Sequence, residues 1–239
     1  MYKQQIDSYF DDPRRRAELV EHISRLVRVR SVREDARPGM PFGPGPAAAL
    51  AEALKLAGEL GFTAKNYDNY VGTVDLSDAE TALHILCHLD VVGEGTGWTV
   101  TEPYEPKEVD GMLYGRGTDD DKGPACAVLM AMQAVKDLGV PLKKNVRLIL
   151  GTDEESGSED LAYYYAREPY APYTFSPDGE FPVINIEKGS YKPVFTKSWD
   201  AEEATPRVKE LHGGFRINVL PPEAECLVAV SYTHLRAHE

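Results

Sequence analysis

The sequence predicts an α/β fold in which a mixed, mostly parallel sheet is flanked by helices, followed by the start of a second, α+β domain. Three observations support this fold class. Segments with a helical spacing of apolar residues alternate with short apolar runs, as in chains whose strands pack between helices. Clusters of Gly, Pro, Asn and Asp separate these segments. From about Tyr191, strand-like pieces follow one another without helices between them.

The first half of the chain supplies two helices and three strands. The expected helices cover residues 13–30 and 47–60, and the expected strands cover residues 63–67, 70–76 and 81–92. Pro13 suits the first turn of its helix, and Pro46 opens the second helix, which Gly61 ends in the C′ position. The Pro- and Gly-rich stretch from 37 to 46 is expected to be an exposed loop.

The second half continues the alternation and then changes. Expected next are a buried helix that is apolar nearly all round at 123–138, a core strand at 145–150 and a short helix at 160–167. Strand-like pieces follow at 191–198, 215–219 and 225–230. We therefore predict a first domain over residues 1–190 and the beginning of a second over 191–230. Residues 231–239 leave an apolar strand without a turn or cap, so we expect a non-native tail on an incomplete chain.

Charge and cysteine content restrict the class of protein. The 239 residues include 39 acidic and 26 basic side chains, a formal charge of -13, which argues against nucleic acid or an anionic membrane as the partner. Cys87, Cys126 and Cys226 are far apart and form no CxxC pair, which favours buried free thiols over a disulfide framework. Residues 1–12 carry no signal-peptide pattern and no apolar run approaches ~20 residues, so we expect a cytoplasmic protein.

One histidine and several carboxylates recur where apolar runs end. The set comprises His88, Asp90, Asp120, Glu154, Glu155 and Asp178. An α/β enzyme assembles a metal site in this way, from the ends of separate strands. Nitrogen and carboxylate ligands without thiolates suit a catalytic zinc or manganese centre better than a structural one.

His84 and His88 are four residues apart, which on a helix would place both on one face, as in a zinc-binding helix. The segment around them is short and bounded by turn residues, so we interpret it as a strand, on which four residues span roughly 13 Å. The two histidines then cannot share one metal, and His84 is expected to be a core residue. Asp90 lies on the same side as His88, ~6.6 Å along the backbone, where it can accept the second imidazole N–H. The alternative is a polar pair at a strand end.

Three acidic loops leave alternatives open. The Gly-rich segment 115–123 does not fit a nucleotide-binding loop, because it lacks the third glycine and has acids where phosphates would bind. Its acids precede a helix, so one of them can cap that helix while another faces a cation. Glu154 and Glu155 have two interpretations. Both can simply be exposed to solvent in a loop. If the backbone is extended, their side chains point in opposite directions, and one can bind a metal while the other holds a water. Asp178 with Gly179 is typical of the tip of a turn, which is the alternative to a metal-binding role for Asp178.

In this order, these segments resemble the di-metal peptidases of metallopeptidase family 20. The motifs are His88-x-Asp90, Gly115-Arg-Gly with Asp120-x-Lys122-Gly123, Glu154-Glu155, and Ser176-Pro-Asp178. The segments 151–158 and 175–183 resemble the PepV-type and Sapep-type bacterial dipeptidases most. The resemblance ends at Val230, and it implies that residues 1–190 belong to the catalytic domain and residues 191–230 to the beginning of the family's lid domain.

The resemblance also implies a ligand set. His88, Asp120 and Asp178 would hold one divalent ion, and Asp120 would bridge to a second ion that Glu155 also binds. The ions would be Zn²⁺, with Mn²⁺ or Co²⁺ as alternatives. The Asp120–Asp121 peptide bond would be cis.

The implied catalytic residues are Glu154, as the general base, and Asp90, which would orient His88. The implied reaction is hydrolysis of dipeptides or short peptides with a free N-terminus, through a water activated by two metal ions. Relatives of full length supply a further histidine to the second ion and another from the lid. His234 and His238 lie in the doubtful tail and are not assigned, so we expect this chain by itself to have little peptidase activity.

Two alternative functions stay open. One is an N-acyl amino acid deacylase or desuccinylase of the same family, and the other, of a different class, is an inactive metal-binding fragment. A nucleotide-binding oxidoreductase that uses Gly115-Arg-Gly117 is disfavoured, because the loop lacks the full glycine pattern.

Overall fold

The computed structural model describes residues 2–179, 184–186, 189, 191, 193–196, 205–214 and 223–231. The chain divides into two compact units, Met1–Ile184 and Asn185–Glu239. The predicted domain boundary at residue 190 lies close to this division. The predicted tail lies almost wholly outside the described residues, so its nature stays a prediction.

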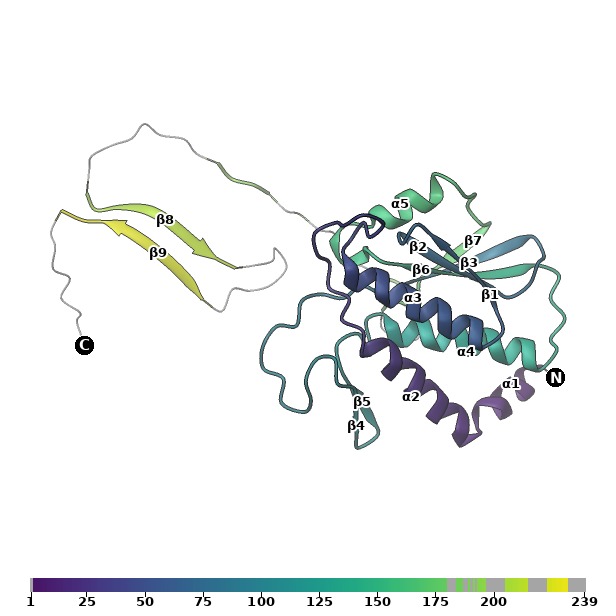
Figure 1. Ribbon diagram of the computed structural model, residues 1–239. Coiled ribbons are helices and arrows are strands. Elements are labelled where there is room, and N and C mark those ends of the chain that lie inside the picture. The colour runs from purple at the N-terminus through teal and green to yellow at the C-terminus, as the bar shows by residue number, and fades with distance from the viewer. Residues whose placement is uncertain are drawn as a thin grey trace. The chain divides into compact units, whose positions relative to one another are not determined.

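The first unit is built on a five-stranded sheet with the order β1-β2-β6-β3-β7 (Figure 1). The strands are β1 (Thr63–Tyr67), β2 (Val71–Asp75), β3 (Thr81–His88), β6 (Asn145–Gly151) and β7 (Tyr173–Phe175). β2 pairs antiparallel with both β1 and β6, whereas β3 pairs parallel with both β6 and β7. The predicted α/β class with a mixed sheet flanked by helices is therefore confirmed.

Helices pack on both faces of this sheet, with one exception. The helices are α1 (Tyr2–Phe10), α2 (Pro13–Val27), α3 (Pro44–Glu59), α4 (Lys122–Asp137) and α5 (Glu159–Tyr165). The exception is α1, which packs against α2 and α4. Leu148 and Leu150 of β6 join the main core with α2, α3 and α4, while Ile149 between them packs with Tyr164 of α5. Alternate residues of a strand point to opposite faces, so α5 lies on the face opposite to α3 and α4.

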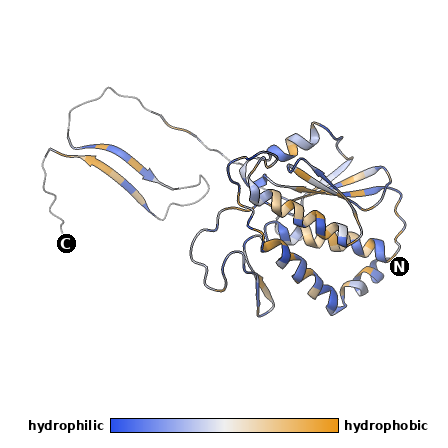
Figure 2. Ribbon diagram, viewed as in Figure 1, coloured by the Kyte–Doolittle hydropathy of each residue, from blue (hydrophilic) through white to orange (hydrophobic). Residues whose placement is uncertain are grey.

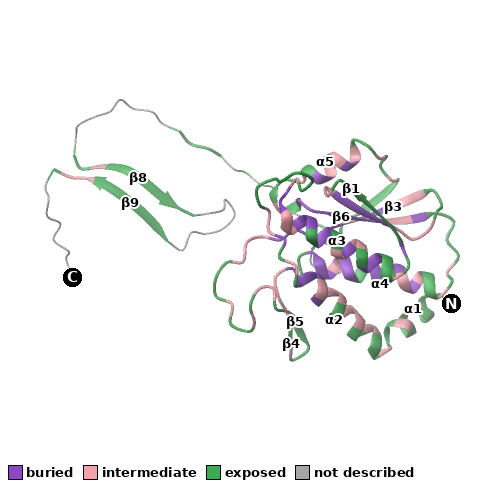
Figure 3. Cartoon of the chain, in the orientation of Figure 1, coloured by how far each residue is buried: buried purple, intermediate pink, exposed green. Residues whose placement is uncertain are grey.

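Helix boundaries follow the expected local signals. The Asp12 side chain accepts a hydrogen bond from the Arg14 N–H at 2.9 Å and caps α2, with Pro13 in the first turn. α3 begins at Pro44, three residues earlier than predicted, and Gly61 follows its end with a positive φ of 78°. α3 and α4 carry many apolar residues, orange in Figure 2, and many buried residues, purple in Figure 3. The helices therefore pack through the residues that the periodicity indicated.

Several short elements were not predicted. They are α1, β7, the pair β4 (Lys107–Val109) and β5 (Met112–Tyr114), and β8 (Arg207–Gly213). Asp110-Gly111 joins β4 to β5 with φ of 51° and 80°, and this dipeptide is a hairpin signal that could have revealed them. β3 ends at His88 instead of residue 92, which leaves Asp90 on the loop after the strand.

The second unit contains an antiparallel pair of β8 and β9 (Ala224–Ala229). β9 corresponds to the predicted strand 225–230. The described residues of 191–198 form no strand, and the predicted strand 215–219 lies outside the described residues. Cys226 of β9 is exposed, contrary to the prediction that all three thiols are buried, because this pair lacks a covering layer among the described residues. Cys87 and Cys126 are buried and free.

In the described part of the chain, no helix has the length and apolar character needed to cross a membrane.

Candidate metal centre

The candidate residues gather at one end of the sheet. β6, β3 and β7 run parallel, so their carboxyl ends lie at the same edge, where α/β proteins bind their ligands. His88 ends β3, Glu154 and Glu155 follow β6 by three and four residues, and Asp178 follows β7 by three. Asp120 lies in the loop that leads into α4.

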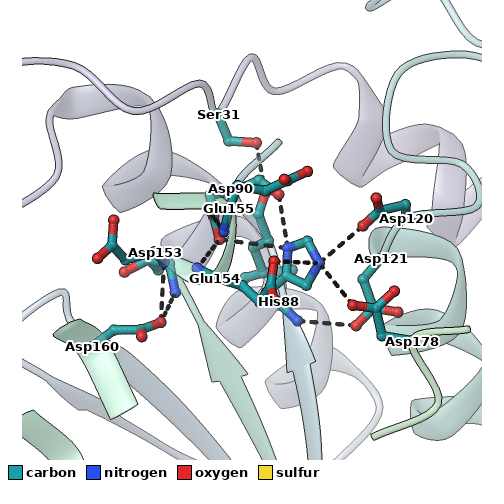
Figure 4. A network of polar contacts seen from close by, with 12 residues as sticks. Ser31, His88, Asp90, Asp120, Asp121, Asp153, Glu154, Glu155, Asp160 and Asp178 are labelled. Carbon is teal, nitrogen blue, oxygen red and sulfur yellow. Dashed lines mark hydrogen bonds and ion pairs between the residues drawn. The ribbon is translucent and has the colours of Figure 1, made fainter. Parts of the chain in front are cut away.

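His88, Asp120 and Asp178 converge on a common point (Figure 4). Each offers one ligand atom, and these atoms lie within 4.8 Å of one another. His88 Nε2 is 2.9 Å from Asp120 Oδ1 and 3.5 Å from Asp178 Oδ2. The predicted convergence of these three side chains is therefore found, while their role as ligands stays a prediction.

The environment of His88 Nε2 fits a divalent cation. This atom is buried and has no partner that meets the geometry of a hydrogen bond, although Asp120 Oδ1 lies 2.9 Å away. A buried polar atom without a partner is costly, and a cation would satisfy it. One imidazole nitrogen with two carboxylates is a donor set that suits zinc or manganese.

The carboxylates around His88 favour the protonated form of its ring when no cation is bound. Burial lowers the pKa of His88, but its contacts with Asp120 and Asp90 outweigh burial and raise it to about 11. The same contact with His88 lowers the pKa of Asp120. Since a metal ligand must be deprotonated, cation binding would displace this proton.

Asp90 contacts both His88 and the loop after β6. Its main-chain oxygen lies 3.0 Å from His88 Nδ1, and its carboxylate Oδ1 is 3.5 Å from the same atom. The carboxylate instead accepts the N–H groups of Glu154 and Glu155, each at 3.1 Å. Asp90 therefore adjoins His88 as predicted, but its backbone rather than its side chain accepts the imidazole hydrogen bond.

Glu154 and Glu155 occupy the single 3₁₀ turn η1 (Glu154–Ser156). The prediction of opposite directions on an extended backbone is therefore wrong, because the chain turns as soon as β6 ends. Glu154 Oε2 lies 3.9 Å from His88 Nε2. The Glu155 carboxylate does not belong to the converging group of the described residues, so its role at a second ion stays a prediction. Burial raises the pKa of both glutamates.

The loop before α4 has two buried residues with unpredicted contacts. The Asp120–Asp121 peptide bond is cis, as expected. Asp121 lies at the N-cap of α4, but its side chain does not cap the helix and instead accepts the His88 N–H at 3.0 Å. Burial raises the pKa of Asp121 to about 7. Lys122 is fully buried, and its Nζ donates to the Leu26 and Val29 carbonyls at 3.1 and 2.8 Å.

The other histidines lie elsewhere. His84 is buried, and its Nδ1 is 3.0 Å from the Tyr165 hydroxyl, which confirms it as a core residue. His212 lies in β8 beside Glu210 in the second unit. His234 and His238 are outside the described residues.

Sequence reasoning missed three residues beside this site. Asp153 and Asp160 are buried, and Arg33 forms an ion pair with Asp153. Arg33 and Asp153 are 120 residues apart, so no local pattern marks that pair. Asp160 bonds the nearby N–H groups of Thr152 and Asp153. The acidic run after β6 was the one available signal.

The chain matches known proteins over most of its length. Residues 84–215 match the model of peptidase family M20/M25/M40. "Putative dipeptidase YtjP" of Bacillus subtilis is 36% identical over 219 residues, which cover 90% of this chain and 47% of that protein. A Staphylococcus aureus (strain NCTC 8325 / PS 47) protein of the same description is 35% identical over 235 residues, with 96% and 49% covered. This chain thus spans about half the length of the curated relatives it matches.

Solved structures resemble the fold. Human carnosine dipeptidase 1 matches with a TM-score of 0.63 and 26% identity, over 74% of this chain and 41% of that one. A dinuclear metal-binding peptidase from Bacillus subtilis, YXEP, matches with a TM-score of 0.53 and 11% identity, over 90% and 64%. The second likeness supports the fold alone.

Proposed function

The chain belongs to peptidase family M20/M25/M40, and we propose that it is part of a metal-dependent hydrolase. This enzyme cleaves dipeptides or short peptides with a free N-terminus. The predicted resemblance to this family is confirmed, whereas the PepV-type or Sapep-type branch stays a prediction. The observation that carries the proposal is the convergence of His88, Asp120 and Asp178 around a buried His88 Nε2 without a hydrogen-bond partner. The descriptions of the curated relatives as dipeptidases support the choice of substrate.

In this proposal, His88, Asp120 and Asp178 would hold one divalent ion, and Asp120 and Glu155 would hold a second. Zinc is the expected metal, with manganese or cobalt as alternatives. When bound, such ions supply Lewis-acid chemistry, which polarises a carbonyl and lowers the pKa of water.

Glu154 is the proposed general base. It takes a proton from the attacking water and later passes it to the leaving amine. Burial raises the pKa of Glu154, which makes its carboxylate a stronger base toward the proton of the water. Asp90 holds the main chain of Glu154 in place and keeps the ring of His88 oriented.

The proposal also covers the partners, the location and the domain division of the protein. We propose a small peptide as the partner, and neither nucleic acid nor a membrane, because of the net charge of -13. The cytoplasmic location and the domain division into residues 1–190 and 191–230 likewise remain proposals.

One set of measurements separates this function from its alternatives. The protein is stripped with a chelator, reloaded with zinc or manganese, and its ions are counted by mass spectrometry. Hydrolysis of a free dipeptide is then compared with hydrolysis of an acetylated and a succinylated amino acid. A protein of the relatives' full length is used, because this chain spans about half of it and little activity is expected of it alone. Cleavage of the dipeptide alone supports the proposal, cleavage of the acylated amino acids supports a deacylase, and ion uptake without either supports a metal-binding fragment. Failure to take up any ion would refute all three.

A further inference from the structure

Two buried carboxylates hold four consecutive backbone N–H groups after β6 (Figure 4). Asp160 Oδ2 accepts from Thr152 at 2.6 Å and from Asp153 at 3.0 Å. Asp90 accepts from the next two residues, Glu154 and Glu155, at 3.1 Å each. The main chain of residues 152–155 is therefore held by two carboxylates, Asp160 at its first two N–H groups and Asp90 at the N–H groups of the two glutamates.

We propose that Asp160 is a positioning residue, which fixes the turn carrying Glu154 and Glu155 so that their carboxylates are presented to the cation and to the attacking water. The proposal rests on the function proposed above. Asp160 acts through the backbone of Thr152 and Asp153, and it contacts neither the converging ligands nor substrate.

The end of β6 is shaped to admit this carboxylate. A Cβ added at Gly151 would lie 2.5 Å from Asp160 Oδ2, closer than two such atoms can approach. Glycine is therefore needed at this position for its lack of a side chain. The second oxygen of Asp160 accepts the Leu161 N–H at 2.7 Å, so both oxygens are used.

A carboxylate suits this position better than a neutral side chain. Asp160 is 1% exposed, and within the described ranges it forms no ion pair with a basic side chain, so three N–H groups stabilise its charge. Hydrogen bonds to an ionised acceptor are about twice as strong as neutral ones, and an asparagine offers one acceptor oxygen instead of two. The negative charge of Asp160 therefore strengthens the hydrogen bonds that hold the backbone of Thr152 and Asp153, between the end of β6 and the turn.

Asp153 strengthens the same segment on its other side. Its carboxylate accepts the Glu159 N–H at 3.1 Å, at the start of α5, and pairs with Arg33. The turn is thereby tied to α5 through two acids, Asp153 and Asp160. A purely structural role for Asp160, such as stabilising the first turn of α5, would not transmit any effect to Glu154 and Glu155, and this difference allows a test.

The test compares Asp160→Ala and Asp160→Asn with the control Asp75→Asn, an acid at the opposite end of the sheet that pairs with Arg147. Two readouts are needed: hydrogen exchange of the amides of residues 152–155 by NMR, and Zn²⁺ affinity by competition with a coloured chelator. Asp160→Ala should speed exchange at all four amides by at least about tenfold, including the two that Asp160 does not touch. It should weaken zinc binding by about 10–100-fold, the usual cost of losing a contact that supports a ligand.

The other variants sharpen this result. Asp160→Asn should recover part of both losses, because its single oxygen can still accept from Thr152 and Asp153. Asp75→Asn should leave the four amides and the zinc affinity unchanged. If Asp160→Ala fails to fold, Gly151→Ala displaces the same carboxylate and takes its place in both measurements.

The proposal is overturned if Asp160→Ala, or Gly151→Ala in its place, leaves exchange at Glu154 and Glu155 and the zinc affinity as in the unsubstituted protein. Absence of zinc binding in the unsubstituted protein would refute the proposed function instead. The exchange pattern would then still decide whether Asp160 positions the turn.

Discussion

The central sheet carries a polar cluster at each of its two ends, and the clusters differ in how their charges are balanced. At one end, Arg147 contacts both oxygens of Asp75 at 2.8 and 3.0 Å, and Asn145 bonds Thr81 at 2.9 Å. At the other end, several carboxylates surround His88, whose buried Nε2 has no hydrogen-bond partner.

The difference separates a cluster whose charges are paired within the protein from the cluster proposed to bind a cation. The Asp75 cluster is complete within the protein, because a guanidinium fork matches a carboxylate in charge and geometry. The His88 cluster has more negative charge than its one imidazole can balance, which is the condition that favours a cation. Substitutions at the two ends should therefore have different consequences.

The largest effect is expected from Asp120→Ala, which removes one of the three converging donors. Zinc affinity should fall by more than the ~10–100-fold that loss of an outer contact costs, because a catalytic zinc normally needs three protein ligands. In a protein of the relatives' full length, turnover should be lost with the ion. Zinc affinity and metal content check this. Asp119→Ala is the matched control, since Asp119 is exposed beside it. Normal zinc content in Asp120→Ala would remove Asp120 from the ligand set.

Glu154→Gln should separate binding from chemistry at the same end of the sheet. In a protein of the relatives' full length, of which this chain spans about half, turnover should fall by about 10²–10⁴-fold, the usual contribution of a general base. Metal content should stay nearly intact. Measurements of kcat and of ions per chain are compared with those for Glu155→Gln, which should lose an ion. Near-normal turnover in Glu154→Gln would exclude it as the base.

Asp75→Asn addresses the opposite end and should affect stability alone. The guanidinium of Arg147 loses a charged acceptor in a partly buried place, so the free energy of unfolding should fall by about 1–3 kcal/mol. Urea denaturation measures the loss, and zinc affinity should not change. A weakened zinc affinity would show that the two ends are coupled.

The smallest effect concerns the pH dependence of His84, between the two clusters. Burial, aided by Arg147, lowers the pKa of His84 below its usual value of 6.5. The unfolded chain then binds more protons there as the pH falls through 6.5, so stability present at pH 7.5 is lost on acidification. The difference in unfolding free energy between the protein and His84→Phe should shrink by less than about 1.4 kcal/mol per pH unit. A difference that does not vary with pH would contradict the assignment.

Much of the fold followed from local pattern. Helices α2, α3 and α4 and strands β1, β2 and β6 lie within a few residues of their predicted positions, because apolar periodicity and flanking Pro or Gly act over short distances. β7 was missed because it has three residues, and none of them is buried. Its place at the edge of the sheet depends on pairing with β3, which no local signal records.

The sequence by itself determined the chemistry at the strand ends. The order of the motifs and the family resemblance singled out His88, Asp120 and Asp178. The parallel pairing of β3 and β7 places His88 and Asp178 at one edge of the sheet, and the loop before α4 brings Asp120 to them. The approach of His88 and Asp178 follows from topology, because the carboxyl ends of parallel strands share one edge.

Only the tertiary structure decided how these side chains are supported. It placed the backbone of Asp90 on His88, turned its carboxylate to the Glu154–Glu155 turn, and brought Asp160 against Gly151. The physical reason is that hydrogen bonds to buried backbone groups depend on where distant segments pass one another. Residue type specifies which groups can accept a hydrogen bond, and packing decides which donor each one meets.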